Sequence, residues 1–90
     1  MKQILHVLRK KDDAHPMEVI RRQVALSHRV TVIFTQDAIH STFMDGLHEL
    51  GVSILALSED ALGTPKHSGT PISYREMLSS IFSADTVVVW

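Results

Sequence analysis

Residues 30–34 read Val30-Thr31-Val32-Ile33-Phe34, a short and almost continuous apolar run that is rich in β-branched side chains. Similar runs occupy residues 4–8 and 52–57, and a fourth follows at residues 86–90. Continuous apolar runs of this length, without strict alternation, are typical of strands that are buried on both faces of a parallel sheet. The sequence therefore predicts four strands in a sheet that helices cover on both sides.

Helical periods fill the first two intervals between these strands. Met17, Ile20 and Val24 recur at helical spacing after Pro16, a residue that the first turn of a helix accepts. A second helix is expected to begin after Asp37, which is a good N-cap residue. It is expected to end before Gly51, because glycine is favourable just past the end of a helix. The apolar positions of this second helix are Ile39, Phe43, Leu47 and Leu50.

A further helix is predicted after Ser73, because Ser73 and Glu76 have the spacing of a capping box. Its core-facing stripe is expected at Tyr74, Leu78 and Ile81 or Phe82. Before it, a short helical turn is expected at residues 59–63 and a loop at residues 63–71, which hold two glycines and two prolines. Two interpretations of this loop stay open, a solvated connection and a mobile flap or partner-contact segment.

The predicted elements alternate between strand and helix along residues 1–90. Such alternation implies right-handed crossovers and a parallel sheet between helical layers. The predicted fold class is thus α/β, a three-layer α/β/α domain with a mainly parallel sheet of four or five strands. One domain is expected over residues 1–90.

Composition excludes several functions for this 90-residue sequence. Nine Lys and Arg stand against ten Asp and Glu, so no general nucleic-acid binder is expected. No apolar run approaches 18 residues, which argues against a membrane-spanning helix, and the N-terminal residues lack a signal-peptide layout. The absence of cysteine excludes thiol nucleophiles, persulfide carriage and thiolate metal ligands on these residues. A cytoplasmic protein without a cofactor is the expectation.

Histidines give no metal motif, although the sequence has six of them. No two are four residues apart, the spacing of a helical zinc site, so no metal is expected. His6 lies within an apolar strand and is interpreted as a hydrogen-bonded core or interface residue. Trp90 is a candidate interface anchor, because a tryptophan ring supplies a large area for burial.

Functional candidates follow from the place where parallel strands end. Ligands and partners of open parallel sheets tend to meet the carboxyl ends of the strands. The residues that follow the four predicted strands are therefore the candidates for partner or ligand contact. They are Arg9, Lys10, Gln36, Asp37, Glu59, Asp60 and Trp90.

Each charged candidate also has a plain structural interpretation. Arg9 and Lys10 suit a solvated loop, and Asp37 suits a helix cap. Glu59 and Asp60 suit the N-terminus of a helix, where the dipole favours negative charge. In the functional interpretation, the cations contact an anion or a partner, and the carboxylates contact a partner.

The order of these motifs resembles the DsrE/DsrF/DsrH family of small sulfur-relay proteins, and most closely its TusB/DsrH branch. The resemblance is carried by Ile4-Leu5-His6-Val7-Leu8, by residues 34–39 (Phe-Thr-Gln-Asp-Ala-Ile), by residues 54–62 (Ile-Leu-Ala-Leu-Ser-Glu-Asp-Ala-Leu) and by Trp90. It implies the DsrE-like fold, a cytoplasmic location and assembly with TusC/DsrF-like and TusD/DsrE-like subunits. Such assemblies pass persulfide sulfur to a TusE/DsrC-like acceptor, for 2-thiolation of the tRNA wobble uridine or for sulfur oxidation.

This resemblance leads to the hypothesis of a non-catalytic subunit in a TusBCD/DsrEFH-like relay, since a chain without cysteine cannot carry the sulfur itself. An alternative hypothesis is a stand-alone homo-oligomer that binds a small anionic ligand through Arg9, Lys10 and helix N-termini. A third is an acid–base enzyme that uses Asp37 and Glu59.

Overall fold

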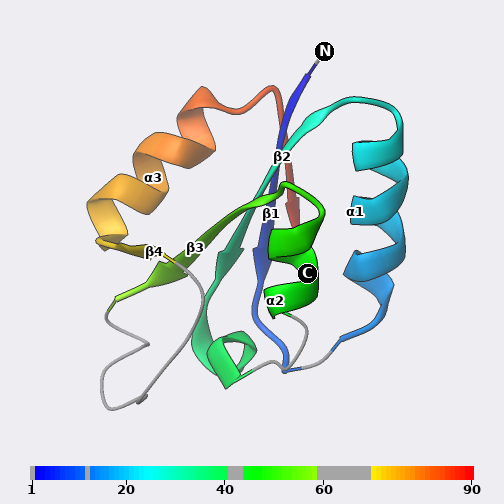
Figure 1. The fold of residues 1–90 in the computed structure, drawn as a ribbon. Coiled ribbons are helices and arrows are strands. Elements are labelled where there is room, and N and C mark those ends of the chain that lie inside the picture. Colours follow the sequence, from blue (N-terminus) through cyan, green and yellow to red (C-terminus); the bar gives the residue numbers. More distant parts are fainter. Residues whose placement is uncertain (1, 12, 41–43, 59–69) are drawn as a thin grey trace.

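A five-stranded sheet forms the centre of the molecule in the computed structural model, which describes residues 2–11, 13–40, 44–58 and 70–90 (Figure 1). Its strand order is β4-β3-β2-β1-β5, and every neighbouring pair is parallel. The strands are β1 (Gln3–Leu8), β2 (Arg29–Phe34), β3 (Ser53–Leu57), β4 (Thr70–Ile72) and β5 (Thr86–Val89). The predicted α/β class with a parallel sheet is confirmed.

Helices cover both faces of this sheet, so the fold has three layers (Figure 1). On one face lie α1 (His15–Ala25), the 3₁₀ helix η1 (Gln36–His40) and α2 (Met44–Glu49). On the other face lies α3 (Tyr74–Ser83). The strand order explains which helices lie on which face. Right-handed crossovers that run in opposite directions along a parallel sheet place their helices on opposite faces.

Two apolar clusters fill the spaces between the layers, which explains why the strands are apolar at successive positions. Alternate side chains of a strand point to opposite faces of the sheet. Leu8, Val32 and Phe34 belong to the cluster under α1 and α2. Leu5 and Ile33 belong to the cluster under α3. Both faces of β1 and β2 are therefore buried, as the continuous runs predicted.

Helix α1 agrees with its predicted pattern, since Pro16 stands at its start and Met17 and Ile20 are buried. Within the span of the second predicted helix the structure describes the 3₁₀ helix η1 and the α-helix α2, and Asp37 lies inside η1 where an N-cap was expected. Leu50 is partly exposed, so it contributes less to the core than the pattern predicted.

The predicted end of the second helix is confirmed. Gly51, two residues after α2, has a φ of +79°, a conformation that glycine adopts without steric cost. Leu47 is completely buried under this helix. Ile39 of the predicted stripe is buried in η1, and Phe43 lies outside the described residues.

Helix α3 begins as predicted but turns a different side to the sheet. The Ser73 Oγ accepts from the backbone N–H of Glu76 at 3.1 Å, and the Glu76 carboxylate accepts from the N–H of Ser73 at 3.0 Å. Met77 is buried and Ile81 packs against the cluster. The expected stripe is wrong at Tyr74 and Leu78, which are 51% and 38% exposed, whereas of the two alternatives for its last position Ile81 is confirmed and Phe82 is 87% exposed. Two adjacent apolar stripes share the helical period here, and periodicity alone does not select between them.

The last residues of the predicted loop belong to strand β4, so the prediction of a loop is wrong there. Pro71 pairs with Ala56 of β3, and the backbone N–H of Ser58 donates to the carbonyl of Ile72 at 2.8 Å. Proline is tolerated because β4 is an edge strand, where one side needs no backbone donor. Residues 59–69, with the predicted helical turn and the rest of that loop, lie outside the described residues.

Candidate functional site at the carboxyl edge of the sheet

Strand β1 is the point at which the chain reverses its direction across the sheet. From β1 the chain proceeds through β2 and β3 to β4, and it then returns to β5 on the other side of β1. The carboxyl edge, at which these parallel strands end, is the usual ligand edge of open α/β sheets at such a reversal. Arg9 and Trp90, which follow β1 and β5, are therefore placed at the reversal point.

Arg9 and Trp90 are in direct contact at this edge. The backbone N–H of Trp90 donates to the carbonyl of Val7 at 2.9 Å, which continues the pairing of β5 with β1. The Nε of Arg9 donates to the carbonyl of Trp90 at 3.1 Å. This contact holds the guanidinium group beside the end of β5 and leaves Arg9 exposed.

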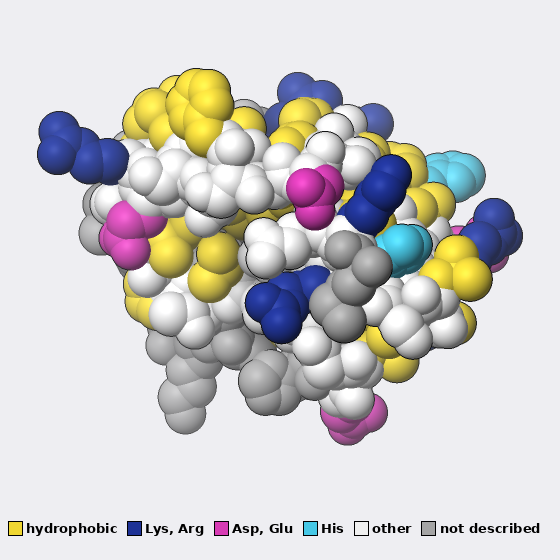
Figure 2. Space-filling view, turned by 90° about the horizontal axis from the view of Figure 1, so that it is seen from above, with side chains coloured by type: hydrophobic (Ala, Val, Ile, Leu, Met, Phe, Trp, Pro, Cys, Tyr) yellow, Lys and Arg dark blue, Asp and Glu magenta, His cyan; other side chains and the backbone are white. Residues whose placement is uncertain are grey.

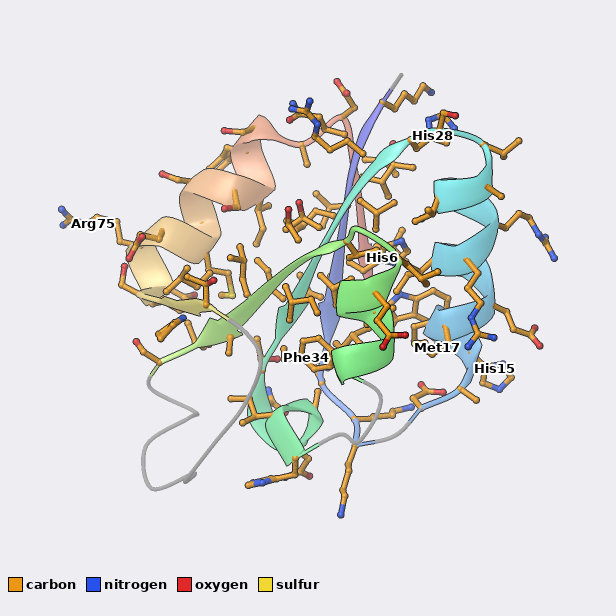
Figure 3. All side chains as sticks on the ribbon, viewed as in Figure 1. His6, His15, Met17, His28, Phe34 and Arg75 are labelled. Atoms are coloured by element: carbon orange, nitrogen blue, oxygen red, sulfur yellow. The ribbon has the colours of Figure 1, made fainter. Side chains whose placement is uncertain are left out.

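The indole ring of Trp90 turns inward and contacts a buried histidine. His6 is 0% exposed, and Figure 3 shows it between the sheet and α1. Its Nδ1 lies 2.8 Å from Nε1 of Trp90, and its Nε2 lies 2.6 Å from Oε1 of Gln23 on α1. The two rings are nearly parallel, with 16° between their planes and 6.0 Å between their centroids.

These contacts fix the protonation state of His6. The indole nitrogen of Trp90 can only donate, so Nδ1 of His6 must accept. The single ring proton of His6 is therefore on Nε2, which donates to the Gln23 oxygen. Burial lowers the pKa of His6 from its ordinary value of 6.5, and the hydrogen bond with Gln23 opposes this effect in part. His6 is thus a neutral, hydrogen-bonded core residue, which confirms its interpretation from sequence.

Thr35 fixes the next loop along the same edge. Its backbone N–H and its Oγ1 each donate to the carbonyl of Leu8, both at 2.9 Å. The ends of β1 and β2 are thereby tied together at a buried position. Gln36 follows with a φ of +50°, a left-handed backbone conformation at which the chain turns into η1.

The contact between Arg9 and Trp90 involves none of the remaining predicted contact residues. Lys10, Gln36 and Asp37 are exposed, whereas Glu59 and Asp60 lie outside the described residues. Sequence analysis missed Gln23, the polar partner of His6. The sequence held a weak signal for Gln23. It follows the buried Ile20 by three residues, which places it on the side of α1 that faces the sheet.

The chemistry of this edge is hydrogen bonding and positive charge. Arg9, Lys10 and Lys11 are exposed in succession after β1. Among the residues that the structure describes, no group of three or more His, Cys, Asp or Glu could hold a metal ion. The arrangement therefore suits contact with an acidic partner surface or a small anion.

A hollow lies at the opposite, amino edge of the sheet, between the strands and the last turns of α3. Its volume is about 330 Å³, and it combines apolar side chains with four hydroxyl-bearing ones. It contains none of the residues that sequence analysis singled out as contact candidates. The lining residues are Gln3, Ile4, Leu5, Thr31, Ser53, Leu55, Ser80, Ser83 and Ala84.

Comparison with known proteins supports the fold. No protein-family model matches the chain, and no curated protein matches it. The crystal structure of the ychN protein from E. coli is similar with a TM-score of 0.76 and 15% sequence identity, over 100% of both chains. The fold is therefore the DsrE-like α/β fold that the sequence predicted. In the described part of the chain, no helix is long and apolar enough to cross a membrane.

Proposed function

We propose that this chain is a non-catalytic, cytoplasmic subunit of a TusBCD/DsrEFH-like sulfur relay complex. Its partners would be TusC/DsrF-like and TusD/DsrE-like subunits, and its role would be to complete the surface over which persulfide sulfur passes to a TusE/DsrC-like acceptor. The observation that carries the proposal is the contact of Arg9 with Trp90 at the reversal point of a DsrE-like sheet. The same 90 residues contain no cysteine.

The construction of the carboxyl edge supports a binding role over a chemical one. His6 is neutral, buried and engaged at both ring nitrogens, so it has no free nitrogen with which to accept a proton from a substrate. Trp90 is held by its backbone and by its indole nitrogen, which makes it a rigid part of the surface. Arg9 then presents a fixed positive charge beside it.

Co-purification tests this proposal. The tagged chain is expressed with TusC/DsrF-like and TusD/DsrE-like subunits, and the mass of the captured complex is measured by native mass spectrometry. We expect a complex with all three chains, and we expect Arg9→Glu to weaken capture. Arg75→Glu is the matched control, because Arg75 extends from α3 on the far side of the molecule (Figure 3). Capture of neither subunit by the wild-type chain would contradict the proposal.

A second candidate function is the binding of a small anion by a stand-alone protein. It is favoured by the three successive exposed cations after β1, whereas the start of α1 already has a carboxylate, because Asp13 accepts from the backbone N–H of His15 at 3.2 Å. Isothermal titration with inorganic phosphate distinguishes the two candidates. Binding that Lys10→Gln weakens, in a chain that captures no relay subunit, would favour this second function.

A further inference from the structure

The hollow at the amino edge arises because small side chains follow large ones between the sheet and α3. In the middle of the sheet, Ile33 and Leu55 are neighbours on adjacent strands, and both pack in the cluster under α3. One row nearer the amino edge, on the same face, the neighbours are Thr31 and Ser53. These two side chains are too small to fill the space that the larger ones hold open between the layers.

Helix α3 changes in the same direction along its length. Met77 is buried in the cluster, whereas the end of the helix lines the hollow with Ser80, Ser83 and the following Ala84. The resulting volume of about 330 Å³ exceeds the ~150 Å³ that holds a benzene ring in an apolar cavity. Figure 2 looks onto this edge of the sheet and shows hydrophobic side chains among the white polar surface on the α3 side.

The hydroxyl groups on the two walls of the hollow differ in what they can still bind. Ser80 and Ser83 each donate from Oγ to the carbonyl four residues earlier in α3, at 3.1 Å and 2.9 Å. A hydroxyl has one proton and two lone pairs, so these two groups can only accept from a ligand. Within the described part of the chain, the hydroxyls of Thr31 and Ser53 have no hydrogen-bond partner. A ligand therefore meets acceptors on the helix wall, and groups that donate as well as accept on the sheet wall.

The charges around the hollow select a neutral ligand. The described residues that line it carry no charge. Arg29 neighbours the lining residue Gln3 in the sheet register, but it is exposed and does not itself line the hollow. The Asp85 carboxylate already accepts from the backbone N–H of Gln3 at 2.8 Å. An anion would lack a lining cation to pair with, and it would bring only acceptors to Ser80 and Ser83.

We propose that this hollow binds a small neutral molecule that combines an apolar ring with a primary carboxamide group. The amide N–H groups donate to Ser80 and Ser83 on the helix wall, and the amide carbonyl accepts from Thr31 or Ser53 on the sheet wall. The ring contacts the apolar part of the lining. A pocket of this size with a few convergent polar groups is typical of small-molecule sites. The site lies at the opposite edge of the sheet from the candidate relay surface, so the proposal does not depend on the relay role.

An NMR titration of the isotope-labelled complete chain tests the proposal, with benzamide as the probe. Benzoate is the matched probe, because it has nearly the same shape but carries a negative charge and only acceptors. We expect benzamide to cause saturable shifts of the backbone N–H signals of Thr31, Ser53, Ser80 and Ser83. We expect benzoate to bind at least about tenfold more weakly, because it leaves hydrogen-bonding groups unpaired.

Three variants locate the binding site. Thr31→Val removes a hydroxyl with little change of shape and should weaken benzamide binding about tenfold. Ser80→Leu should abolish binding, because the larger side chain fills the hollow. Thr86→Val is the matched control and should bind as the wild type does, because Thr86 is an exposed strand threonine that does not line the hollow. The dispersion of the amide signals establishes that each variant is folded.

Three results would overturn the proposal. The first is the absence of saturable shifts at the lining residues up to the solubility limit of benzamide. The second is binding that both Thr31→Val and Ser80→Leu leave unchanged. The third is a preference for benzoate, which would assign the hollow to an anion if Arg29→Gln removed that binding, and to unselective apolar contact if it did not. A chain that captures the relay subunits but binds no benzamide contradicts this site alone.

Discussion

The indole Nε1 of Trp90 donates a hydrogen bond of 2.8 Å to Nδ1 of His6, a residue 84 positions earlier in the chain. This bond joins the last described residue to the centre of β1, and it exists only while His6 is neutral. A proton on Nδ1 would place two N–H groups against each other. The packing of Trp90 at the carboxyl edge therefore depends on the protonation state of His6.

The first prediction concerns stability against pH. The folded state holds the pKa of His6 below 6.5, so the unfolded chain takes up a proton at a higher pH than the folded one. The free energy of unfolding should therefore fall as the pH falls below about 6.5, with no contribution from His6 at higher pH. Urea unfolding at several pH values between about 5 and 8 measures this.

Two variants isolate the contribution of His6 to this pH dependence. His6→Gln should reduce the loss of stability on the acid side, because it removes the buried titrating ring. His15→Gln is the matched control, because it replaces an exposed histidine at the start of α1 (Figure 3). Equal acid slopes for the wild type and His6→Gln would show that the loss has another origin.

The second prediction concerns Gln23, the acceptor for the Nε2–H of His6. Gln23→Leu should lower the free energy of unfolding by about 1–3 kcal/mol, because it leaves a buried donor without a partner. Gln23→Glu should raise the pKa of His6, because a carboxylate in the same place favours the charged ring. An NMR titration of the His6 ring measures the second effect. A pKa unchanged by Gln23→Glu would argue that the two side chains are not in contact.

The third prediction separates the two roles of Trp90. Trp90→Phe keeps an aromatic ring but removes the N–H that donates to His6. The pKa of His6 should rise toward its ordinary value, because a proton on Nδ1 no longer faces a donor. The single tryptophan of the sequence makes the wild-type environment visible by fluorescence, which should change over the same pH range as the His6 titration. Fluorescence that is independent of pH would contradict the coupling.

The fourth prediction concerns the start of α3. Ser73→Ala removes the oxygen that accepts from the N–H of Glu76, and it should lower the free energy of unfolding by about 1 kcal/mol. Ser79→Ala is the matched control, because Ser79 is exposed in the middle of the same helix and alanine favours helix there. Thermal unfolding followed by circular dichroism compares the two. The capping role would be refuted by equal stability of the two variants.

Much of the fold was predictable because burial on both faces leaves a strong local pattern. The runs at residues 4–8 and 30–34 correspond to β1 and β2, and Ser73 with Glu76 marked the start of α3. Strand β4 was missed, because Pro71 and its neighbours have the composition of a turn, and three residues are too few to show a period. Its pairing with β3 depends on contacts that the local sequence does not encode.

The candidate site was predictable only in part, because it depends on strand order. The carboxyl-end rule selected Arg9 and Trp90 separately, but their contact requires β5 to return beside β1. The partnership of His6 with Gln23 likewise depends on how α1 packs over β1. The side of α3 that faces the sheet was decided by the packing of its Met77 and Ile81 on the strands, and the helical period allowed either stripe.

The position of β5 beside β1 also sets the order in which the molecule is completed during synthesis. Strand β1 emerges from the ribosome before β5, its neighbour, which is made only after some eighty further residues. Until then the nascent chain carries β1 paired on one side only, with His6 lacking its indole partner. Contacts of such long sequence separation form slowly. Pairing of the four-residue strand β5 with β1 is therefore a late step, and a ribosome that stalls before β5 leaves an open template for aggregation.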